Sequence, residues 1–172
     1  MRRLRGTVYL DAIGGTVAQN LVASAGTITR EYETGPAARK AVQAVSGTIA
    51  TTSNTDVYCV VPETGTLASV DFSGIDALAA HDTNYITWSI TNLGQAGAGS
   101  TVLLAATAAN TTKVTGGTAL VANGKRSLTL TGTAADLAVT AGDRLLIRAA
   151  ANGTLANTVT APIYLLRFAG TT

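Results

Sequence analysis

A run of strictly alternating side chains between Tyr85 and Thr91 constrains the fold more than any other feature of this sequence. Ile86, Trp88 and Ile90 alternate there with tyrosine, threonine and serine. Successive side chains of an extended strand point to opposite faces, so period two predicts a β-strand with one buried face. The only tryptophan of the chain lies on that apolar face, and we therefore predict that Trp88 packs in the core.

Runs of similar composition recur along the chain at spacings of about 8–12 residues, with turn-forming residues between them. An Asn123–Gly124 pair is a strong β-hairpin signal, and residues 74–82 could form one helical turn. Long loops at 92–100 and 108–118 favour crossing connections over a simple meander. The pattern predicts an all-β fold, a jelly-roll or Greek-key β-sandwich of about eight to ten strands. The expected strands include 56–61, 65–72, 101–107, 126–131, 144–150 and 158–168.

The alternation also assigns side chains to faces. Within residues 144–150 it places Leu145, Ile147 and Ala149 inside and both arginines outside. In the run that begins at Thr101, it places Val102 and Leu104 in the core. Leu103 and Leu146 then lie opposite the core as exposed apolar residues. This predicts that part of one sheet is covered, by a partner subunit or by a third layer.

Residues 1–45 differ from the rest, because their apolar residues are scattered among glycine and alanine. Residues 37–42 could form one or two helical turns. Two interpretations remain open for the whole segment: an extended arm that lies on another protein, or edge strands of the same domain. We take residues 1–45 as an N-terminal arm or extension and residues 46–172 as the β-sandwich domain.

Charge and cysteine content limit the classes of function. Charged residues make up 13% of the chain and the formal net charge is +2, so no basic face indicates nucleic-acid binding. Residues 1–20 do not form a convincing signal peptide, and no apolar run is long enough to cross a bilayer. The single cysteine, Cys59, cannot form a disulfide within the chain and is expected to be a small buried hydrophobe.

The sequence gives little support to an enzyme. His81 and Asp82 are adjacent, but no nucleophile can be paired with them, and a turn explains both. One histidine and one cysteine cannot supply a zinc site. Asp71, Asp76 and Asp82 are too widely spaced for a calcium loop. Glu63 lies in a turn, without a second carboxylate placed for glycoside hydrolysis. We expect no catalytic residues, no cofactor and no metal.

Four segments carry a resemblance to a known family: residues 64–72 (TGTLASVDF), 84–94 (NYITWSITNLG), 96–100 (AGAGS) and 139–147 (VTAGDRLLI). Their strands and turns resemble those of tailed-bacteriophage head decoration, or cement, proteins and related virion proteins of jelly-roll type. The resemblance covers about residues 46–168.

The resemblance implies a virion structural protein that binds the outer surface of an assembled head and stabilises it. Its partner would be the major capsid protein, it would form a homotrimer or another homo-oligomer, and it would be made in the host cytoplasm. From composition and position we predict that N-terminal residues make the contact. The alternative is a tail or fibre-associated module that binds a host glycan or another virion protein. The predicted contact residues are Arg2, Arg3, Arg5, Val8, Tyr9 and Leu10.

Overall fold

The structure, a computed structural model, describes residues 21–24, 27–30 and 39–170. The chain divides into two compact units, residues 1–35 and residues 36–172. In the first unit, β1 (Leu21–Ser24) and β2 (Thr27–Arg30) pair antiparallel. The second unit holds the remaining strands and two short 3-10 helices.

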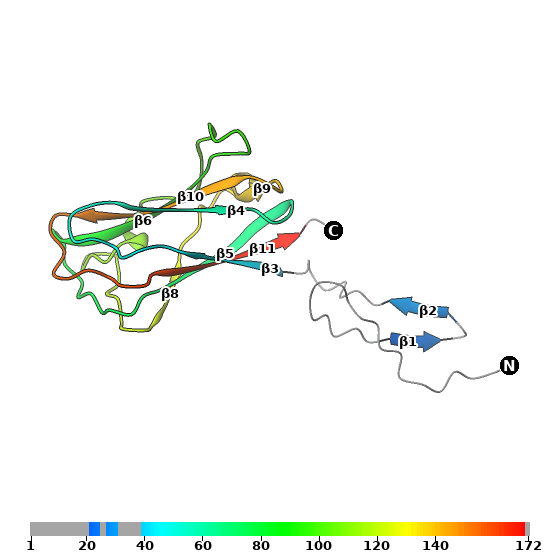
Figure 1. Cartoon of the computed structure of the whole chain (residues 1–172), viewed down its shortest axis with the longest axis horizontal. Helices are drawn as coiled ribbons and strands as arrows, with labels where there is room; N and C mark the ends of the chain where they lie inside the picture. Colours follow the sequence, from blue (N-terminus) through cyan, green and yellow to red (C-terminus); the bar gives the residue numbers. More distant parts are fainter. Residues whose placement is uncertain (1–20, 25–26, 31–38, 171–172) are drawn as a thin grey trace. The chain divides into compact units, whose positions relative to one another are not determined.

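Two antiparallel sheets form the second unit, so the predicted all-β sandwich is confirmed (Figure 1). One sheet has the order β4-β10-β6-β7, and the other has the order β3-β11-β5-β8 with β9 also paired to β5. The elements are β3 (Arg39–Val45), β4 (Thr55–Val60), β5 (Gly65–Ser73), β6 (Tyr85–Asn92), β7 (Thr101–Leu104), η1 (Ala108–Asn110), β8 (Lys125–Leu128), η2 (Ala134–Leu137), β9 (Ala138–Val139), β10 (Arg144–Asn152) and β11 (Ile163–Gly170).

The strand pairings give jelly-roll wiring. β3 pairs with β11, β4 with β10, β5 with β8 and β6 with β7, as in one long antiparallel ribbon that turns back between β6 and β7. Successive pairs of this ribbon lie in alternate sheets, so the ribbon is rolled up. Two further pairings, β10 with β6 and β11 with β5, join neighbouring turns of the roll and complete each sheet.

The core lies between the sheets and is centred on aromatic rings from three strands. Trp88 of β6 is fully buried, as predicted, and its ring centroid lies 5.0 Å from that of Phe72 on β5. Phe72 in turn lies 5.2 Å from Tyr164 on β11. Tilted rings at these separations attract one another beyond the effect of burial alone. The alternating strand that contains Trp88 therefore contacts the opposite sheet through the tryptophan ring.

One face assignment from the sequence is wrong. Leu103, expected to be exposed, is fully buried, and Val102, expected in the core, is 42% exposed. Ile90 pairs with Leu104, while the next residue, Thr91, pairs with Val102, so Leu103 is the extra residue of a β-bulge. A bulge interrupts the alternation, and Leu103 and Leu104 both enter the core.

Three local expectations are also corrected. Residues 39–45 form β3, paired to β11, and not the helical turns expected at 37–42. Residues 74–82 contain no helical turn, because Leu78 forms a β-bridge with Leu120. Asn123 and Gly124 do form a turn, with Asn123 at φ +57°, but no hairpin results, since β8 pairs with β5.

The bulge predicts a contrast between adjacent residues of β7. Leu103→Ala should lower the free energy of unfolding by about 2–5 kcal/mol, because it leaves a cavity in the core. Val102→Ala, one position earlier on the outer face, should change it by less than about 1 kcal/mol. Urea unfolding followed by Trp88 fluorescence measures both. Equal effects of the two substitutions would contradict the bulged geometry.

Candidate functional site

The residues predicted to contact a capsid, Arg2, Arg3, Arg5, Val8, Tyr9 and Leu10, lie outside the described residues. Their role stays a prediction. The groups that can be placed are the loops at the ends of the sandwich, a groove beside β8, and the outer faces of the two sheets.

His81 and Asp82 organise loops, as expected. Nδ1 of His81 accepts hydrogen bonds from the backbone N–H groups of Thr83 and Asn84, both at 3.0 Å. Asp82 accepts a bond from the backbone N–H of Thr115 at 2.9 Å. Nδ1 of His81 is thus bonded within its own turn, whereas the carboxylate of Asp82 is bonded to the backbone of Thr115.

The other carboxylates are dispersed. Asp76 accepts a 2.7 Å bond from the backbone N–H of Thr160, and Asp71 is buried on the outer face of β5. Among residues 21–24, 27–30 and 39–170, no three His, Cys, Asp or Glu side chains gather as they would around a metal ion. Within the same ranges, no helix is long and apolar enough to span a membrane.

Cys59 lies on the inner face of β4 and is buried, as expected. Burial raises the pKa of its thiol to about 11, because the thiolate would lose its hydration. At neutral pH the side chain is therefore a protonated core residue with little nucleophilic character.

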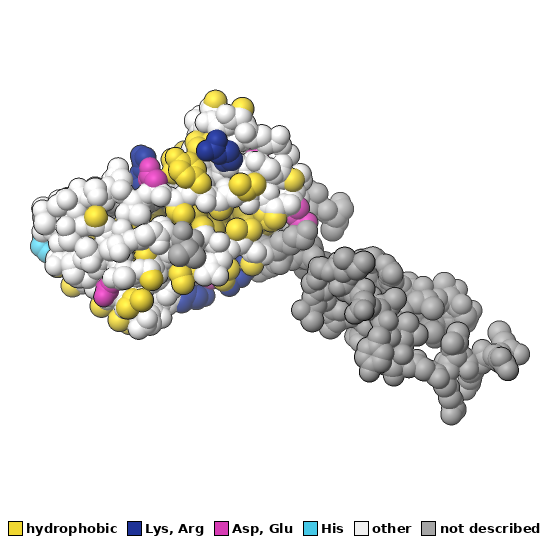
Figure 2. Space-filling view, viewed as in Figure 1, with side chains coloured by type: hydrophobic (Ala, Val, Ile, Leu, Met, Phe, Trp, Pro, Cys, Tyr) yellow, Lys and Arg dark blue, Asp and Glu magenta, His cyan; other side chains and the backbone are white. Residues whose placement is uncertain are grey.

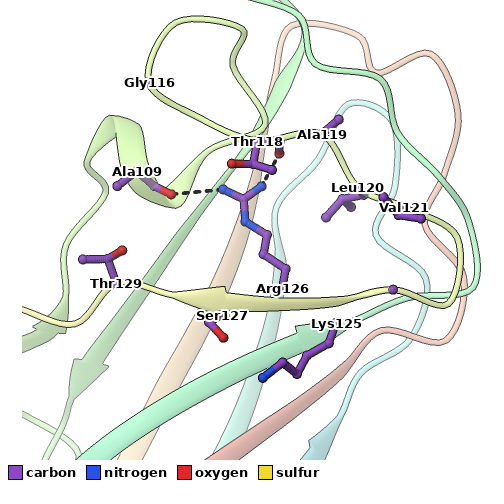
Figure 3. A pocket seen from close by; sticks show the side chains of 11 residues that line it. Ala109, Gly116, Thr118, Ala119, Leu120, Val121, Lys125, Arg126, Ser127 and Thr129 are labelled. Carbon is purple, nitrogen blue, oxygen red and sulfur yellow. Dashed lines mark hydrogen bonds between the residues drawn. The ribbon is translucent and has the colours of Figure 1, made fainter.

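Arg126 forms the inner wall of a groove of about 470 Å³ between β8 and the loop that precedes it. Its guanidinium lies 4.8 Å from the centre of the Trp88 ring and donates hydrogen bonds to the carbonyl oxygens of Ala109, Thr111 and Thr118. Figure 3 shows the side chain reaching from β8 into the loop. Burial lowers its pKa from the ordinary value.

The partners of Arg126 explain why the groove is a weak candidate for binding anions. It donates to three backbone carbonyls, and these direct negative partial charge at the guanidinium. Most of its donor capacity is therefore used in fixing the loop. We interpret Arg126 as the anchor of the 108–121 loop, a role that the sequence did not reveal.

The outer face of the β5 sheet is polar and internally satisfied. Asp71 accepts a 2.5 Å bond from Arg167 and a 2.7 Å bond from the hydroxyl of Ser127, with the Lys125 ammonium at 3.6 Å. Burial acts to raise the pKa of Asp71, but these bonds and the charge of Lys125 outweigh it, so the pKa lies below its usual value. This face offers few unpaired groups to a partner.

The outer face of the other sheet carries an apolar row across all four strands. In the register, Tyr58 of β4 lies beside Leu146 of β10, Thr91 of β6 and Val102 of β7. Tyr58 and Val60 are 54% and 58% exposed. Leu146 lies on this outer face, as predicted, and is half-buried there. Figure 2 shows hydrophobic side chains gathered along the side of the sandwich that contains β4.

We call the four residues Tyr58, Leu146, Thr91 and Val102 the apolar row. Charged side chains border it. Arg148 binds Asp56 through two 2.7 Å hydrogen bonds, and this pairing lowers the pKa of Asp56. The guanidinium of Arg144 lies 5.6 Å from the Tyr58 ring centre and has no carboxylate partner among the residues that the structure describes. The row therefore has one neutralised pair and one available cation at its border.

Sequence reasoning placed residues 56–61 in a strand but did not identify Tyr58 and Val60 as surface residues. The run alternates Asp56, Tyr58 and Val60 with Val57 and Cys59, so both of its faces are largely apolar. Only the charge of Asp56 distinguished the outer face. Compared with known proteins, the chain has no match among family models, curated proteins or solved structures.

The buried thiol gives a prediction for alkylation. At pH 8 native Cys59 should react with iodoacetamide roughly a hundredfold more slowly than in urea, because its pKa of about 11 leaves little thiolate. Val102→Cys in a Cys59→Ala background supplies an exposed thiol for comparison. Native Cys59 reacting as fast as that thiol would contradict the burial.

The anchoring role of Arg126 predicts a loss of stability on its removal. Arg126→Met keeps the packing of the side-chain stem but removes a hydrogen-bond donor from three carbonyls, so the free energy of unfolding should fall by roughly 3 kcal/mol. Lys125→Met, its exposed neighbour, should change stability by about 0.5 kcal/mol or less. Chemical denaturation of both variants compares them, and an Arg126→Met protein as stable as the parent would disprove the role.

Proposed function

We propose that this chain is a virion structural protein, a capsid decoration protein that binds the outer surface of an assembled phage head and stabilises it. The observation that carries the proposal is the jelly-roll wiring of a small sandwich that exposes an apolar row on one sheet. Eight-stranded jelly rolls occur in viral capsid proteins and in lectins. The resemblance of residues 46–168 to head decoration proteins supports the first class.

The two outer faces support different roles. The β5 sheet carries Asp71 with its bonds to Arg167 and Ser127 already made. The β4 sheet carries the apolar row, and burial of such surface contributes about 25 cal/mol per Å². Arg144 at its border adds a cation that an acidic shell surface can pair. We assign the β4 sheet, together with the N-terminal segment, to the contact with the head.

Stabilisation then follows from mass action. A protein that binds the assembled shell and not the free subunits favours the shell by about 2.7 kcal/mol per site at a free concentration of 100 Kd. Copies that are joined to one another also bind the repeating shell together, so that weak individual contacts add through avidity. The mechanism needs surface complementarity and many copies, and no chemical step.

A tail or fibre module that binds a host glycan is the second candidate. The observation in its favour is Tyr58, an aromatic ring that is 54% exposed on a sheet face with Arg144 beside it. Sugar rings stack on exposed aromatic side chains. Immunogold labelling of purified particles separates the candidates, because the proposal expects label on heads and the alternative expects it on tails.

Removal of residues 1–35 tests the proposed contact. The deletion stops there because β3 belongs to the sandwich. Co-sedimentation with undecorated heads should show full-length protein binding, and the truncated protein should bind at least about tenfold more weakly, a change of about 1.4 kcal/mol. Circular dichroism should show the same β-sheet spectrum for both. The proposed contact is wrong if the truncated protein decorates heads as well as the full chain does.

A further inference from the structure

β4 is an edge strand of its sheet, and some of its backbone N–H and C=O groups have no partner within that sheet. The backbone N–H of Val61 bonds to the carbonyl of Asp143 at 2.9 Å, and the β4–β10 register continues from that pair. Hydrogen-bonded pairs alternate along an antiparallel ladder, so Val57 and Cys59 face β10. The N–H and C=O groups of Asp56, Tyr58 and Val60 therefore point away from the sheet. Among residues 21–24, 27–30 and 39–170, no group of a turn or loop bonds to them.

The other sheet edges carry features that oppose pairing with another chain. β7 has four residues and is bulged against β6. β8 also has four residues and begins with Lys125 and Arg126. β3 begins with Arg39 and Lys40.

β4 lacks these protections. It has six residues and an unbroken register with β10. Its one charged side chain, Asp56, is neutralised by Arg148. Its outward side chains Tyr58 and Val60 are more than half exposed. An edge of this kind is a ready template for an added strand.

We propose that the occupant is β4 of a second copy of this chain, paired antiparallel about a two-fold axis at Tyr58. In this register Tyr58 lies opposite Tyr58 of the second copy, and Asp56 lies opposite Val60 in both directions. All three free residues of each strand then form hydrogen-bonded pairs. Two-fold pairing of identical surfaces is the commonest form of homo-oligomer.

The side chains match this arrangement. The two tyrosines form an aromatic cross-strand pair, and no like charges lie directly opposite one another. Arg144 of β10 lies beside Val60 of the same copy. Val60 in turn lies opposite Asp56 of the second copy. The guanidinium of Arg144 and that carboxylate are therefore on the same row of the joined sheet. The two four-stranded sheets become one continuous sheet, and the apolar row extends across both copies.

The inference concerns the isolated protein and does not depend on the proposed function. Sedimentation equilibrium of the full chain tests it with Tyr58→Lys and Val102→Lys as a matched pair. Both place a lysine on an exposed outer-face position of an edge strand in the same sheet. The full chain and the Val102→Lys variant should associate alike. Tyr58→Lys places two like charges directly opposite each other at the two-fold axis, so it should weaken association at least tenfold.

Three outcomes of the same measurement overturn the proposal. The first is a parent chain that stays monomeric at the highest concentration measured. The second is equal weakening of association by both lysines, and the third is an oligomer, such as a trimer, that Tyr58→Lys leaves intact. Far-ultraviolet circular dichroism establishes that each variant is folded, so that a loss of association is not a loss of structure.

Cross-linking tests the register separately. Tyr58→Cys in a Cys59→Ala background places two thiols opposite each other with Cα atoms about 5.5 Å apart, within the range of a disulfide. Mild oxidation should produce a covalent dimer, and Val102→Cys in the same background should not. Failure of the position-58 thiols to link under conditions where the folded protein associates overturns the two-fold register.

Discussion

The burial of Trp88 between Phe72 and Arg126 is the contact on which the rest of this sandwich depends. The indole ring belongs to β6 and Phe72 belongs to β5, so their contact joins the two sheets. Arg126 of β8 covers the same ring and binds three carbonyls of the loop before it. Core packing and the position of the 108–121 loop are therefore linked through one side chain. A change at Trp88 acts on both, because the guanidinium would lose the ring on which it rests.

The sequence predicted those elements whose pattern is set by burial of one face. Residues 85–91 and 144–150 alternate cleanly because each lies in the middle of a sheet with one side against the core. At β7 the prediction failed, since the bulge turns Leu103 inward and alternation cannot signal an inserted residue. Arg39–Val45 contains lysine and arginine beside alanine, a composition that does not distinguish a sheet edge from a helical turn.

The sequence did not predict which strands pair with one another, and the candidate site depends on this pairing. Asn123 and Gly124 form the turn that their residue types favour. The strand that follows, β8, nevertheless pairs with β5, which is distant in the sequence. The exposure of Tyr58 depends in the same way on β4 being last in its sheet, which follows from the rolled ribbon and not from the local run. The sequence did not reveal the role of Arg126, because the carbonyls that bind its guanidinium are brought to it by the loop.

Backbone hydrogen bonds alone would let two β4 strands pair in several registers, so specificity must come from side chains. Centring the pair on Cys59 places Asp56 opposite Pro62, which has no N–H to donate. Centring it on Asp56 places two carboxylates directly opposite, and like charges in that position are destabilising. The register centred on Tyr58 avoids both and uses every free backbone group of the strand. Asp56 thus has two effects on the same edge: Arg148 neutralises it enough to allow pairing, and its remaining polarity selects how the strands align.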